Sequence, residues 1–279
     1  MIELITSGIG TCLQDLGRLR TRQFGVPVGG AMDQISAINA NRLLGNEDDA
    51  IVIEMMYSGP QLLVHEPCTV ALRGGNFRCI IDGKEVDSSK PIPLYKGNQI
   101  QFRTGTTGMF GYLAVRGGVK SDKVLGSGTS LSGYTGKSRL KKGDMLEAND
   151  EKISKVDQNK EVIDTDYNTS SIAVYPGPEY EAFAHKLPDL ETMTWTVSNS
   201  SNRMSYQMEE LLSKEASGIL TAPVQAGTVQ LTPSGRLVVL MRDCQTTGGY
   251  ARILQLTDRA VSQLAQKRPG SRINFSLKL

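Results

Sequence analysis

The sequence predicts a mainly β fold with a few short helices, and two observations support that prediction. Short apolar runs recur along the chain, and Gly, Pro or Asp-Gly pairs separate them, as in short strands joined by tight turns. Glycine is also abundant, with 29 among 279 residues, which fits a chain that turns often. The length is enough for one large domain or two medium ones.

The N-terminal part is predicted to begin with a strand, ELIT, followed by turns and a helix. Asp33 is placed to cap the start of a helix that runs to about Leu44, with Gly45 at its C-terminal end. Asn39 lies on the apolar face of this helix. A polar side chain on such a face needs a hydrogen-bonding partner.

Residues 51–146 show a β pattern, with the predicted strands QLLV, TVAL, FRCII, QIQF and GYLAV. The stretch IDGKEV carries the Asp-Gly signal of a hairpin. Two short echoes, LRGGNF with VRGGVK and YKGNQI with KKGDML, fit a barrel whose corners reuse the same turn chemistry. We therefore place a first β region at residues 1–147.

An exposed polar connection is predicted over residues 148–170, and a second β region over 171–279. AVYP, WTVSN, TVQLT, LVVLM and ILQL are the predicted strands of the second region. A helix is predicted from Thr257 to Arg268, where Lys267 and Arg268 would complement the dipole at its C-terminal end.

Composition and charge argue against several classes of protein. The net charge is +2 and no block of basic residues occurs, so we expect neither a nucleic-acid partner nor a membrane surface. No apolar stretch approaches the roughly 18 residues of a membrane span, and MIELITSGIG lacks the pattern of a signal peptide. Four cysteines without CxxC spacing fit a reducing compartment, so we expect a cytoplasmic protein.

Recognisable motifs for metal, nucleotide and biotin are missing from the sequence. His65 and His185 are the only histidines, and we interpret both as structural, so no metal site is predicted. A P-loop that ends in the GKS triplet at Ser138 would need a glycine at the position of Leu131. The sequence contains no Met-Lys-Met motif that could accept biotin, and it shows no sign of an ATP-grasp domain. It also lacks a nucleophile elbow.

The best candidate for a binding site is the stretch RDCQTTGGYAR. If LVVLM and ARILQLT pair, their connection is longer than an ordinary hairpin loop, and long ordered loops often carry function. Its glycines allow close backbone approach, and its arginine forks suit a carboxylate or a phosphate. The alternative is a capped turn whose arginines form surface ion pairs. The candidate residues are Arg242, Gln245, Thr246, Thr247, Gly248, Gly249, Tyr250 and Arg252.

A second polar cluster lies near the N-terminus, in QDLGR, GVPVGGAMD and NAN. Glycines alternate there with Asp, Arg and Asn before a helix start, where backbone N–H groups favour anions. The alternative is simple helix capping by Asp33, with glycines in turns. The candidate residues of this cluster are Asp15, Arg18, Asp33 and Asn39.

Six stretches, taken in their order along the chain, resemble the 5-oxoprolinase C-subunit family. They are QDLGR, GVPVGGAMD, VLGS, PGPEYEAF, SNRMSYQM and DCQTTGGYARI. Its members are also known as KipI-antagonist, allophanate hydrolase subunit 2-like or biotin-dependent carboxyltransferase proteins. The resemblance covers nearly the whole chain. It implies a cyclophilin-like β-barrel architecture with two related barrels, which would occupy the two predicted β regions and can interdigitate.

The resemblance also implies a function. Together with an A-subunit and with a B-subunit or KipI-like partner, the C-subunit opens 5-oxoproline to glutamate, using ATP. This chain is then expected to be inactive alone, to bind a small amide or lactam and to meet ATP only through the complex. Two alternatives stay open, namely a biotin-dependent carboxyltransferase component acting on urea or a similar amide, and a non-enzymatic antagonist of a KipI-like kinase inhibitor.

Roles for the candidate residues are hypotheses that follow from this resemblance. Asp15 or Asp33 would orient a nucleophile, and Arg252 with Arg242 would hold a carboxylate or phosphoryl group. The backbone of residues 246–249 would stabilise an oxyanion. Cys244 is not expected to be a nucleophile, because no histidine lies in a recognisable partner motif. Four positions depart from the family pattern, namely Gly29 for Ser, Gly128 for Arg, Asn202 for Asp and Cys244 for Arg.

Overall fold

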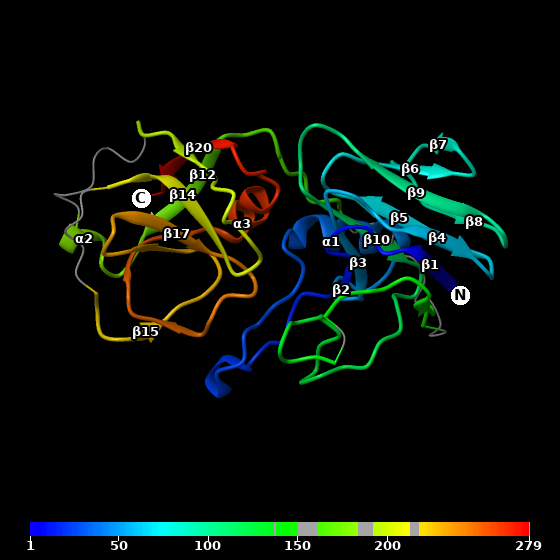
Figure 1. Cartoon of the computed structure of the whole chain (residues 1–279), viewed down its shortest axis with the longest axis horizontal. Helices are drawn as coiled ribbons and strands as arrows, with labels where there is room; N and C mark the ends of the chain where they lie inside the picture. Colours follow the sequence, from blue (N-terminus) through cyan, green and yellow to red (C-terminus); the bar gives the residue numbers. More distant parts are fainter. Residues whose placement is uncertain (137, 150–160, 184–191, 213–217, 279) are drawn as a thin grey trace. The chain divides into compact units, whose positions relative to one another are not determined.

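The structure of the protein is a computed structural model that describes residues 1–136, 138–149, 161–183, 192–212 and 218–278 (Figure 1). Lys137 of the GKS triplet and His185 lie outside the described residues. The chain divides into two compact units. Unit 1 consists of Met1–Arg18 and Asp33–Asp164, and unit 2 consists of Leu19–Met32 and Thr165–Leu279.

Unit 1 is built from antiparallel strands and one helix. Its elements are β1 (Ile2–Thr6), β2 (Cys12–Gln14), α1 (Gln34–Leu44), β3 (Val52–Met56), β4 (Gln61–Val64), β5 (Cys68–Arg73), β6 (Phe77–Ile81), β7 (Lys84–Val86), β8 (Ile92–Leu94), β9 (Gln99–Thr104), β10 (Phe110–Val115) and β11 (Met145–Leu146). They form a six-stranded sheet in the order β11-β1-β4-β9-β6-β7 and a five-stranded sheet in the order β2-β3-β10-β5-β8. The mainly β prediction is confirmed.

The core of unit 1 gathers side chains from both sheets. Strand β1 buries Ile2 and Leu4, and β4 buries Leu62 and Val64, which is the alternation of a strand with one face in the core. Strand β10 is buried at every position because α1 packs on β10 and β5. The predicted strands of residues 51–146 therefore lie where their apolar periodicity placed them.

Helix α1 begins and ends as predicted from its local signals. Asp33 is the N-cap, and its carboxylate accepts hydrogen bonds from the backbone N–H of Ser36 at 3.1 Å and from the Ser36 hydroxyl at 2.6 Å. Gly45 closes the helix in the left-handed region with φ of 72°, and its N–H donates to the Arg42 carbonyl. Both predicted caps are confirmed.

The turns of unit 1 follow their glycine signals. Strands β6 and β7 pair across Asp82 and Gly83, whose φ angles are 48° and 81°, and so form the hairpin predicted from IDGKEV. The two Gly-Gly pairs of the LRGGNF and VRGGVK echoes follow β5 and β10, and all four glycines have φ between 56° and 85°. The glycines of the two echoes share the left-handed conformation, but the turns differ, because the Phe77 N–H donates to the Gly74 carbonyl whereas the Gly118 N–H donates to the Val115 carbonyl.

Unit 2 contains a nearly closed barrel sheet and a short two-stranded ribbon. Its elements are the 3-10 turn η1 (Arg22–Phe24), β12 (Ser171–Pro176), α2 (Tyr180–Phe183), β13 (Trp195–Thr196), β14 (Ser205–Leu211), β15 (Ala222–Pro223), β16 (Thr228–Leu231), β17 (Arg236–Leu240), β18 (Thr247–Gly248), β19 (Ala251–Leu256), α3 (Asp258–Ala265) and β20 (Arg272–Leu277). The large sheet has the order β13-β20-β12-β19-β16-β17-β14, and β15 pairs with β18. A bridge between Val197 and Met208 brings its two edges together.

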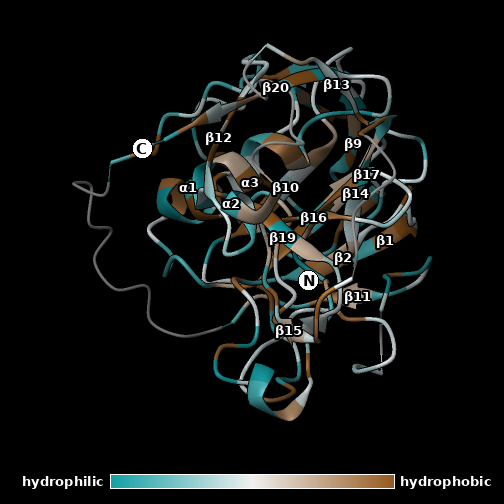
Figure 2. Cartoon of the chain, turned by 90° about the vertical axis from the view of Figure 1, so that its left-hand side faces the viewer, coloured by the Kyte–Doolittle hydropathy of each residue, from teal (hydrophilic) through white to brown (hydrophobic). Residues whose placement is uncertain are grey.

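Apolar side chains fill the barrel of unit 2 and the layer beneath α3. Figure 2 colours apolar residues brown, and they concentrate along the strands. Trp195 is fully buried, and its ring centroid lies 6.1 Å from that of Phe275. Helix α3 buries Ala260, Val261 and Leu264 and packs on β12 and β19. Among the described residues, no helix combines the length and the apolar character needed to span a membrane.

Two expectations for the second half were wrong. LVVLM and ARILQLT do not pair, because β16 lies between β17 and β19 and is hydrogen-bonded to both. The connection from Arg242 to Tyr250 is therefore a crossover rather than a hairpin loop. The predicted strand WTVSN is also shorter than expected, since β13 contains only Trp195 and Thr196.

Helix α3 is shorter than the predicted helix from Thr257 to Arg268. Thr257 is the N-cap, but the helix ends at Ala265, and no basic residue lies in its last turn. The expected dipole role of Lys267 and Arg268 is therefore wrong. Lys267 is instead buried, its ammonium donates to the Tyr167 carbonyl at 2.9 Å, and this burial lowers its pKa.

Candidate functional site

A cavity of about 580 Å³ opens in unit 2. This volume lies within the range of small-molecule binding sites. Tyr175 and residues from the segments 22–29, 224–226, 242–246 and 255–258 line the cavity. The predicted RDCQTTGGY loop thus contributes one wall, and the short segment Leu19–Met32 contributes another.

Local hydrogen bonds shape the loop of residues 242–246. The Cys244 N–H donates to the Met241 carbonyl at 3.1 Å, which turns the chain directly after β17. The Val224 N–H then donates to the Thr246 carbonyl at 3.0 Å, and β18 continues along β15. The loop is therefore held against the β15 side of the cavity.

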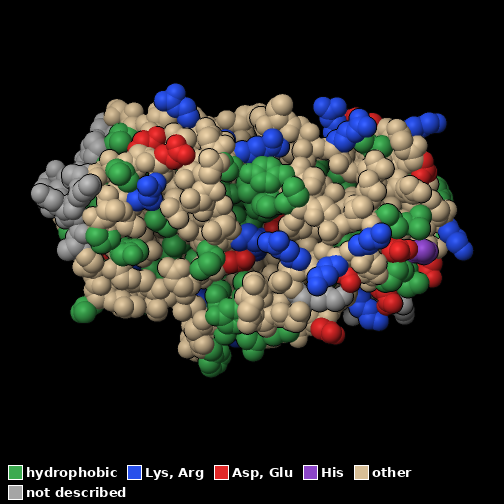
Figure 3. Space-filling view, viewed as in Figure 1, with side chains coloured by type: hydrophobic (Ala, Val, Ile, Leu, Met, Phe, Trp, Pro, Cys, Tyr) green, Lys and Arg blue, Asp and Glu red, His purple; other side chains and the backbone are tan. Residues whose placement is uncertain are grey.

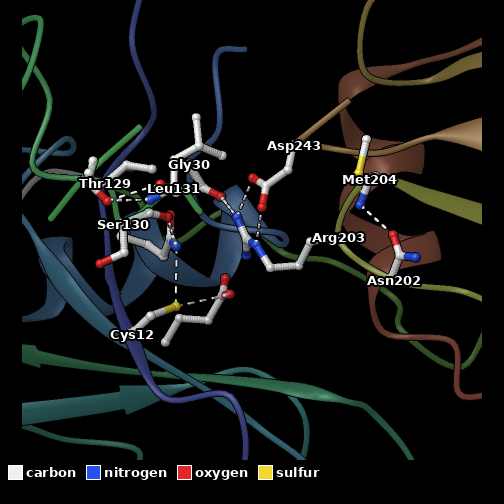
Figure 4. A network of polar contacts seen from close by, with 12 residues as sticks. Cys12, Gly30, Thr129, Ser130, Leu131, Asn202, Arg203, Met204 and Asp243 are labelled. Atoms are coloured by element: carbon white, nitrogen blue, oxygen red, sulfur yellow. Dashed lines mark hydrogen bonds and ion pairs between the residues drawn. The ribbon is translucent and has the colours of Figure 1, made fainter. Parts of the chain in front are cut away.

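Arg203 ties two walls of the cavity together without lining it (Figure 4). Its guanidinium donates to both oxygens of Asp243, at 2.7 and 2.8 Å, and its Nη2 also donates to the Gly30 carbonyl at 2.7 Å. The Gly29 N–H donates to the Arg242 carbonyl at 3.1 Å. A bidentate ion pair of this kind fixes the geometry of both chain segments.

The cavity lining carries more positive than negative charge. Arg22 and Arg242 both line it, whereas Asp258 is the single carboxylate among the lining residues that the structure describes. The Arg22 guanidinium donates to the Val224 carbonyl and, at 3.4 Å, to Oε1 of Gln225, while Arg242 is only 9% exposed. Two arginines in a partly closed site favour a ligand with a carboxylate or phosphate group.

Cys244 gives the cavity an apolar patch. Its side chain packs with Val224 and Leu240. Burial raises the pKa of the Cys244 thiol to about 11, although the positive charges of Arg22 and Arg242 oppose the rise. The thiol is therefore protonated at neutral pH and is not an activated nucleophile, because the thiolate is the reactive form.

Amide and hydroxyl groups complete the lining. Gln245 and Thr246 come from the loop, and Gln255 from β19. The Gln255 amide donates to the carbonyls of Ala226 and Leu256, at 3.0 and 3.2 Å, so it braces the wall of the cavity. Gln245 and Thr246 are the lining groups whose chemistry suits a carbonyl or an amide of a ligand.

The structure divides the loop candidates into two groups. Arg242, Gln245 and Thr246 line the cavity, whereas Thr247 and Gly248 form β18. Neither Gly249 nor Tyr250 is among the lining residues. The Gly249 carbonyl accepts a hydrogen bond from Ile219 and the Tyr250 carbonyl one from Gln230. A Cβ at Gly248 would lie 2.6 Å from the Gln230 amide nitrogen, so a larger residue there would displace the Gln230 side chain.

Arg252 is engaged within unit 2 and is not part of the cavity lining. Its Nε and Nη2 donate to the Glu179 carboxylate at 2.9 and 2.7 Å, and its Nη1 donates to the Pro223 carbonyl at 3.0 Å. The fork that was expected to hold a ligand thus binds Glu179. The hydrogen bond from Arg252 is the main cause that lowers the pKa of Glu179.

Arg252→Lys is expected to lower the thermal stability of the chain and to leave any activity that depends on the cavity within about tenfold of the wild type. Lysine keeps the charge but loses the bidentate contact with Glu179. Because the pKa of Glu179 is lowered, the stabilisation by this pair is present above the ordinary carboxyl pKa and is lost as the pH falls through the lowered value. Thermal melts across the acid range measure it, and a large kinetic loss with an unchanged melting temperature would return Arg252 to the binding site.

In unit 1, the Asp15 carboxylate is a hub of hydrogen bonds. It accepts from the Ser127 hydroxyl at 2.7 and 2.9 Å, from the Gly128 N–H at 2.8 Å, from the Gly17 N–H at 2.7 Å and from the Thr129 hydroxyl. Asp15 is 8% exposed. This pattern describes a carboxylate that organises a loop of its own unit.

Arg18 serves the same loop of unit 1. It is 1% exposed, its Nε donates to the Val124 carbonyl at 3.1 Å, and its Nη2 donates to the Thr129 carbonyl. Gly128 lies between these contacts, and a Cβ there would lie 2.2 Å from Cδ1 of Ile51. The departure from the family pattern at Gly128 therefore fits the packing of this loop.

Asp33 and Asn39 also have partners inside unit 1. Asp33 is the N-cap of α1, and its backbone N–H donates to the Tyr112 hydroxyl at 2.8 Å. Burial raises the pKa of Tyr112, whose hydroxyl donates to Glu54 at 2.9 Å. The Asn39 amide pairs with the backbone of Ile163 through two hydrogen bonds of 2.8 Å, which is the partner that its place on an apolar face demanded.

Arg22 is a charged lining residue that sequence reasoning missed. It stands in η1, which ends at Gly25 with φ of 73°. The available signal was its position three residues before the start of GVPVGGAMD, a stretch already singled out for its glycines. Among the described residues, no group of three or more His, Cys, Asp or Glu could hold a metal ion, and Nε2 of His65 lies 2.7 Å from Glu3.

The fold and this cavity define a carboxyltransferase-type domain, and the chain belongs to that family. The model of the carboxyltransferase domain, subdomain A and B, matches residues 24–277. The chain is similar to the C-subunit of 5-oxoprolinase from Haemophilus influenzae, with 31% identity over 99% of this chain and 90% of that protein.

Two further relatives show how the same fold occurs in longer proteins. Urea amidolyase of Saccharomyces cerevisiae is 36% identical over 151 residues, which cover 52% of this chain and 8% of that protein. The crystal structure of TTHA0988 matches 99% of this chain with a TM-score of 0.88 and 28% identity. This chain covers 55% of TTHA0988 and so spans little more than half of it.

Proposed function

We propose that this chain is the C-subunit of an ATP-dependent 5-oxoprolinase, which opens 5-oxo-L-proline to L-glutamate. The observation that carries the proposal is the cationic cavity of unit 2, where Arg22 and Arg242 stand beside amide and hydroxyl groups. Similarity to a 5-oxoprolinase C-subunit over 99% of the chain supports it.

The chemistry of 5-oxoproline matches the parts of this cavity. Its carboxylate would pair with Arg242 and Arg22, since guanidinium forks recognise carboxylates. The lactam carbonyl would accept hydrogen bonds from Thr246 and Gln245. The ring methylenes would pack on the apolar patch formed by Cys244 and its neighbours.

The reaction needs other proteins in this proposal. The sequence contains no nucleotide motif that we recognise, so ATP would enter through the complex with the 5-oxoprolinase A-subunit and with a B-subunit or KipI-like protein. We expect the complex in the cytoplasm, which agrees with four cysteines that are all free thiols.

Oxoproline-dependent ATP hydrolysis by the reconstituted complex tests the proposal. The complete three-protein complex is expected to hydrolyse ATP when 5-oxoproline is added. This chain alone, or the complex without it, is expected to show no such activity. Robust turnover by the isolated chain would reject the role as one part of a complex, and tight binding to the KipI-like B-subunit without any turnover would favour the antagonist function instead.

A biotin-dependent carboxyltransferase component is the second candidate, because the chain belongs to the carboxyltransferase domain family and resembles a urea amidolyase. Urea carries no carboxylate, but the carboxyl group that would be transferred to it does, so the two arginines of the cavity fit either candidate. Carboxylation of urea by a complex of this chain with a biotinylated carrier protein, in the absence of 5-oxoproline, would favour the second candidate.

A further inference from the structure

Asp258 contributes a carboxylate to the lining of the cavity in unit 2. It is the first residue of α3 and directly follows the N-cap Thr257. Figure 3 shows Asp and Glu side chains at several places on the drawn face, so an exposed carboxylate does not by itself mark a site. What distinguishes Asp258 is its place in a cavity that also contains two arginines.

The Asp258 carboxylate has neither a hydrogen-bonding nor an ion-pairing partner among the described residues. Its neighbours on the same wall are engaged within the chain. The Gln255 amide donates to two carbonyls, and its oxygen accepts from the Thr228 hydroxyl at 2.9 Å. The Thr257 hydroxyl oxygen accepts from the Ala260 N–H at 3.1 Å. Asp258 is therefore the charged acceptor that this wall offers to a ligand.

Asp258 stands apart from the arginine end of the cavity. Burial is the main cause of the raised pKa of the Cys244 thiol, and the charges of Arg22 and Arg242 oppose it. Asp243 also acts on this thiol, whereas Asp258 is not among the charges that affect it. The Asp258 carboxylate therefore lies further from Cys244 than these three charges.

A short wall segment from Val224 to Gly227 joins the two ends of the cavity. At one end, the Val224 N–H donates to the Thr246 carbonyl at 3.0 Å. At the other end, the Gly227 carbonyl accepts from the Leu256 N–H at 2.8 Å, two positions before Asp258. Three residue steps reach at most about 11 Å, so a compact ligand can touch both ends.

The shape of 5-oxoproline places its N–H toward the Asp258 end. In the proposed function, Arg22 and Arg242 hold the carboxylate of the ligand, and the ring methylenes pack on Cys244 and its neighbours. In a five-membered lactam of this kind, the N–H lies on the side of the ring opposite the two methylenes. The N–H therefore points away from Cys244, to the side where Asp258 offers an acceptor.

We propose that the Asp258 carboxylate accepts a hydrogen bond from the lactam N–H of 5-oxoproline and pairs with the ammonium of L-glutamate after ring opening. This inference rests on the proposed function and narrows its substrate class to amides that carry both a carboxylate and an N–H. A carboxylate forms strong hydrogen bonds with N–H donors, above all with charged ones. A ring ketone without the N–H would leave the Asp258 carboxylate without this partner.

Three ligands of the reconstituted complex test the role of Asp258. Steady-state ATP hydrolysis gives KM for 5-oxoproline and the inhibition constants of L-glutamate and of 3-oxocyclopentane-1-carboxylate, a ketone in which a methylene replaces the N–H. Asp258→Ala is expected to raise KM and the glutamate constant at least about tenfold, the effect of losing a hydrogen bond to a charged group. The constant of the ketone is expected to stay near the wild-type value.

A second variant and a matched control sharpen the test. Asp258→Asn keeps an acceptor for the lactam N–H but loses the charge, so the glutamate constant should rise more than KM for 5-oxoproline. Glu181→Ala is the control, because Glu181 is an exposed carboxylate in the first turn of α2 in the same unit and does not line the cavity. All three constants of the control are expected at wild-type values.

The outcomes separate this inference from the proposed function. An active wild-type complex in which Asp258→Ala shifts all three constants equally, or none of them, overturns the inference. Asp258 would then serve only the dipole of α3, which favours an acidic residue in the first turn. A wild-type complex without oxoproline-dependent activity rejects the proposed function and this inference with it. Equal melting temperatures of the variants confirm that folded chains are compared.

Discussion

Arg242→Ala is expected to lower kcat/KM for 5-oxoproline in the assembled complex by roughly 30- to 5,000-fold. Removing one partner of a desolvated charge pair costs about 2–5 kcal/mol, and Arg242 lines the cavity with only 9% of its surface exposed. Steady-state ATP hydrolysis with varied 5-oxoproline measures the change. The loss should be much smaller for any neutral substrate, because the interaction removed is with a carboxylate.

Arg272→Ala provides the control for this prediction. Arg272 is an exposed arginine on β20 of the same unit and is not part of the cavity lining. Its replacement removes an equal charge and is expected to leave kcat/KM near the wild-type value. Equal kinetics for the two variants, in correctly assembled complexes, would remove the cavity of unit 2 from the substrate site.

Asp15→Ala is expected to lower the free energy of unfolding by about 3–5 kcal/mol. The Asp15 carboxylate accepts hydrogen bonds from Gly17, Ser127, Gly128 and Thr129, and its removal leaves these donors, three of them on buried residues, without this acceptor. Denaturant titration with a probe for unit 1 measures the loss.

Asp122→Ala is the matched control, because Asp122 is an exposed carboxylate of the same unit. Surface substitutions of this kind usually stay within about 0.5 kcal/mol. Full stability of Asp15→Ala combined with lost turnover would contradict the structural role and support the catalytic role that the family resemblance implies.

Features that depend on neighbouring residues could be predicted from the sequence. The caps of α1 at Asp33 and Gly45 and the Asp82-Gly83 hairpin each require only a few adjacent residues, and all were found. Several strands of the first β region, such as β4, β6, β9 and β10, were found for the same reason, since the alternation of a strand is local, but β2, β3, β8 and β11 were not predicted.

Features that depend on distant residues could not be predicted in the same way. The β16 strand lies between β17 and β19, and no residue pattern in the loop after β17 predicts that order. The Asp15 partners Ser127 and Gly128 lie 112 and 113 positions away in the sequence, so the hydrogen bonds of this carboxylate could not be predicted from its neighbours. The place of Arg22 in the cavity could not be predicted, because its partners Val224 and Gln225 lie 202 and 203 positions further along the chain.

Arg203 has a consequence for how this site could be redesigned. It stands outside the cavity, yet it joins Asp243 of one wall to the Gly30 carbonyl of another. The frame of the site is therefore separate from the surface that meets a ligand. Exchanges at Gln245 or Thr246 leave that frame untouched, so a library at these positions can explore new ligands without loosening the walls.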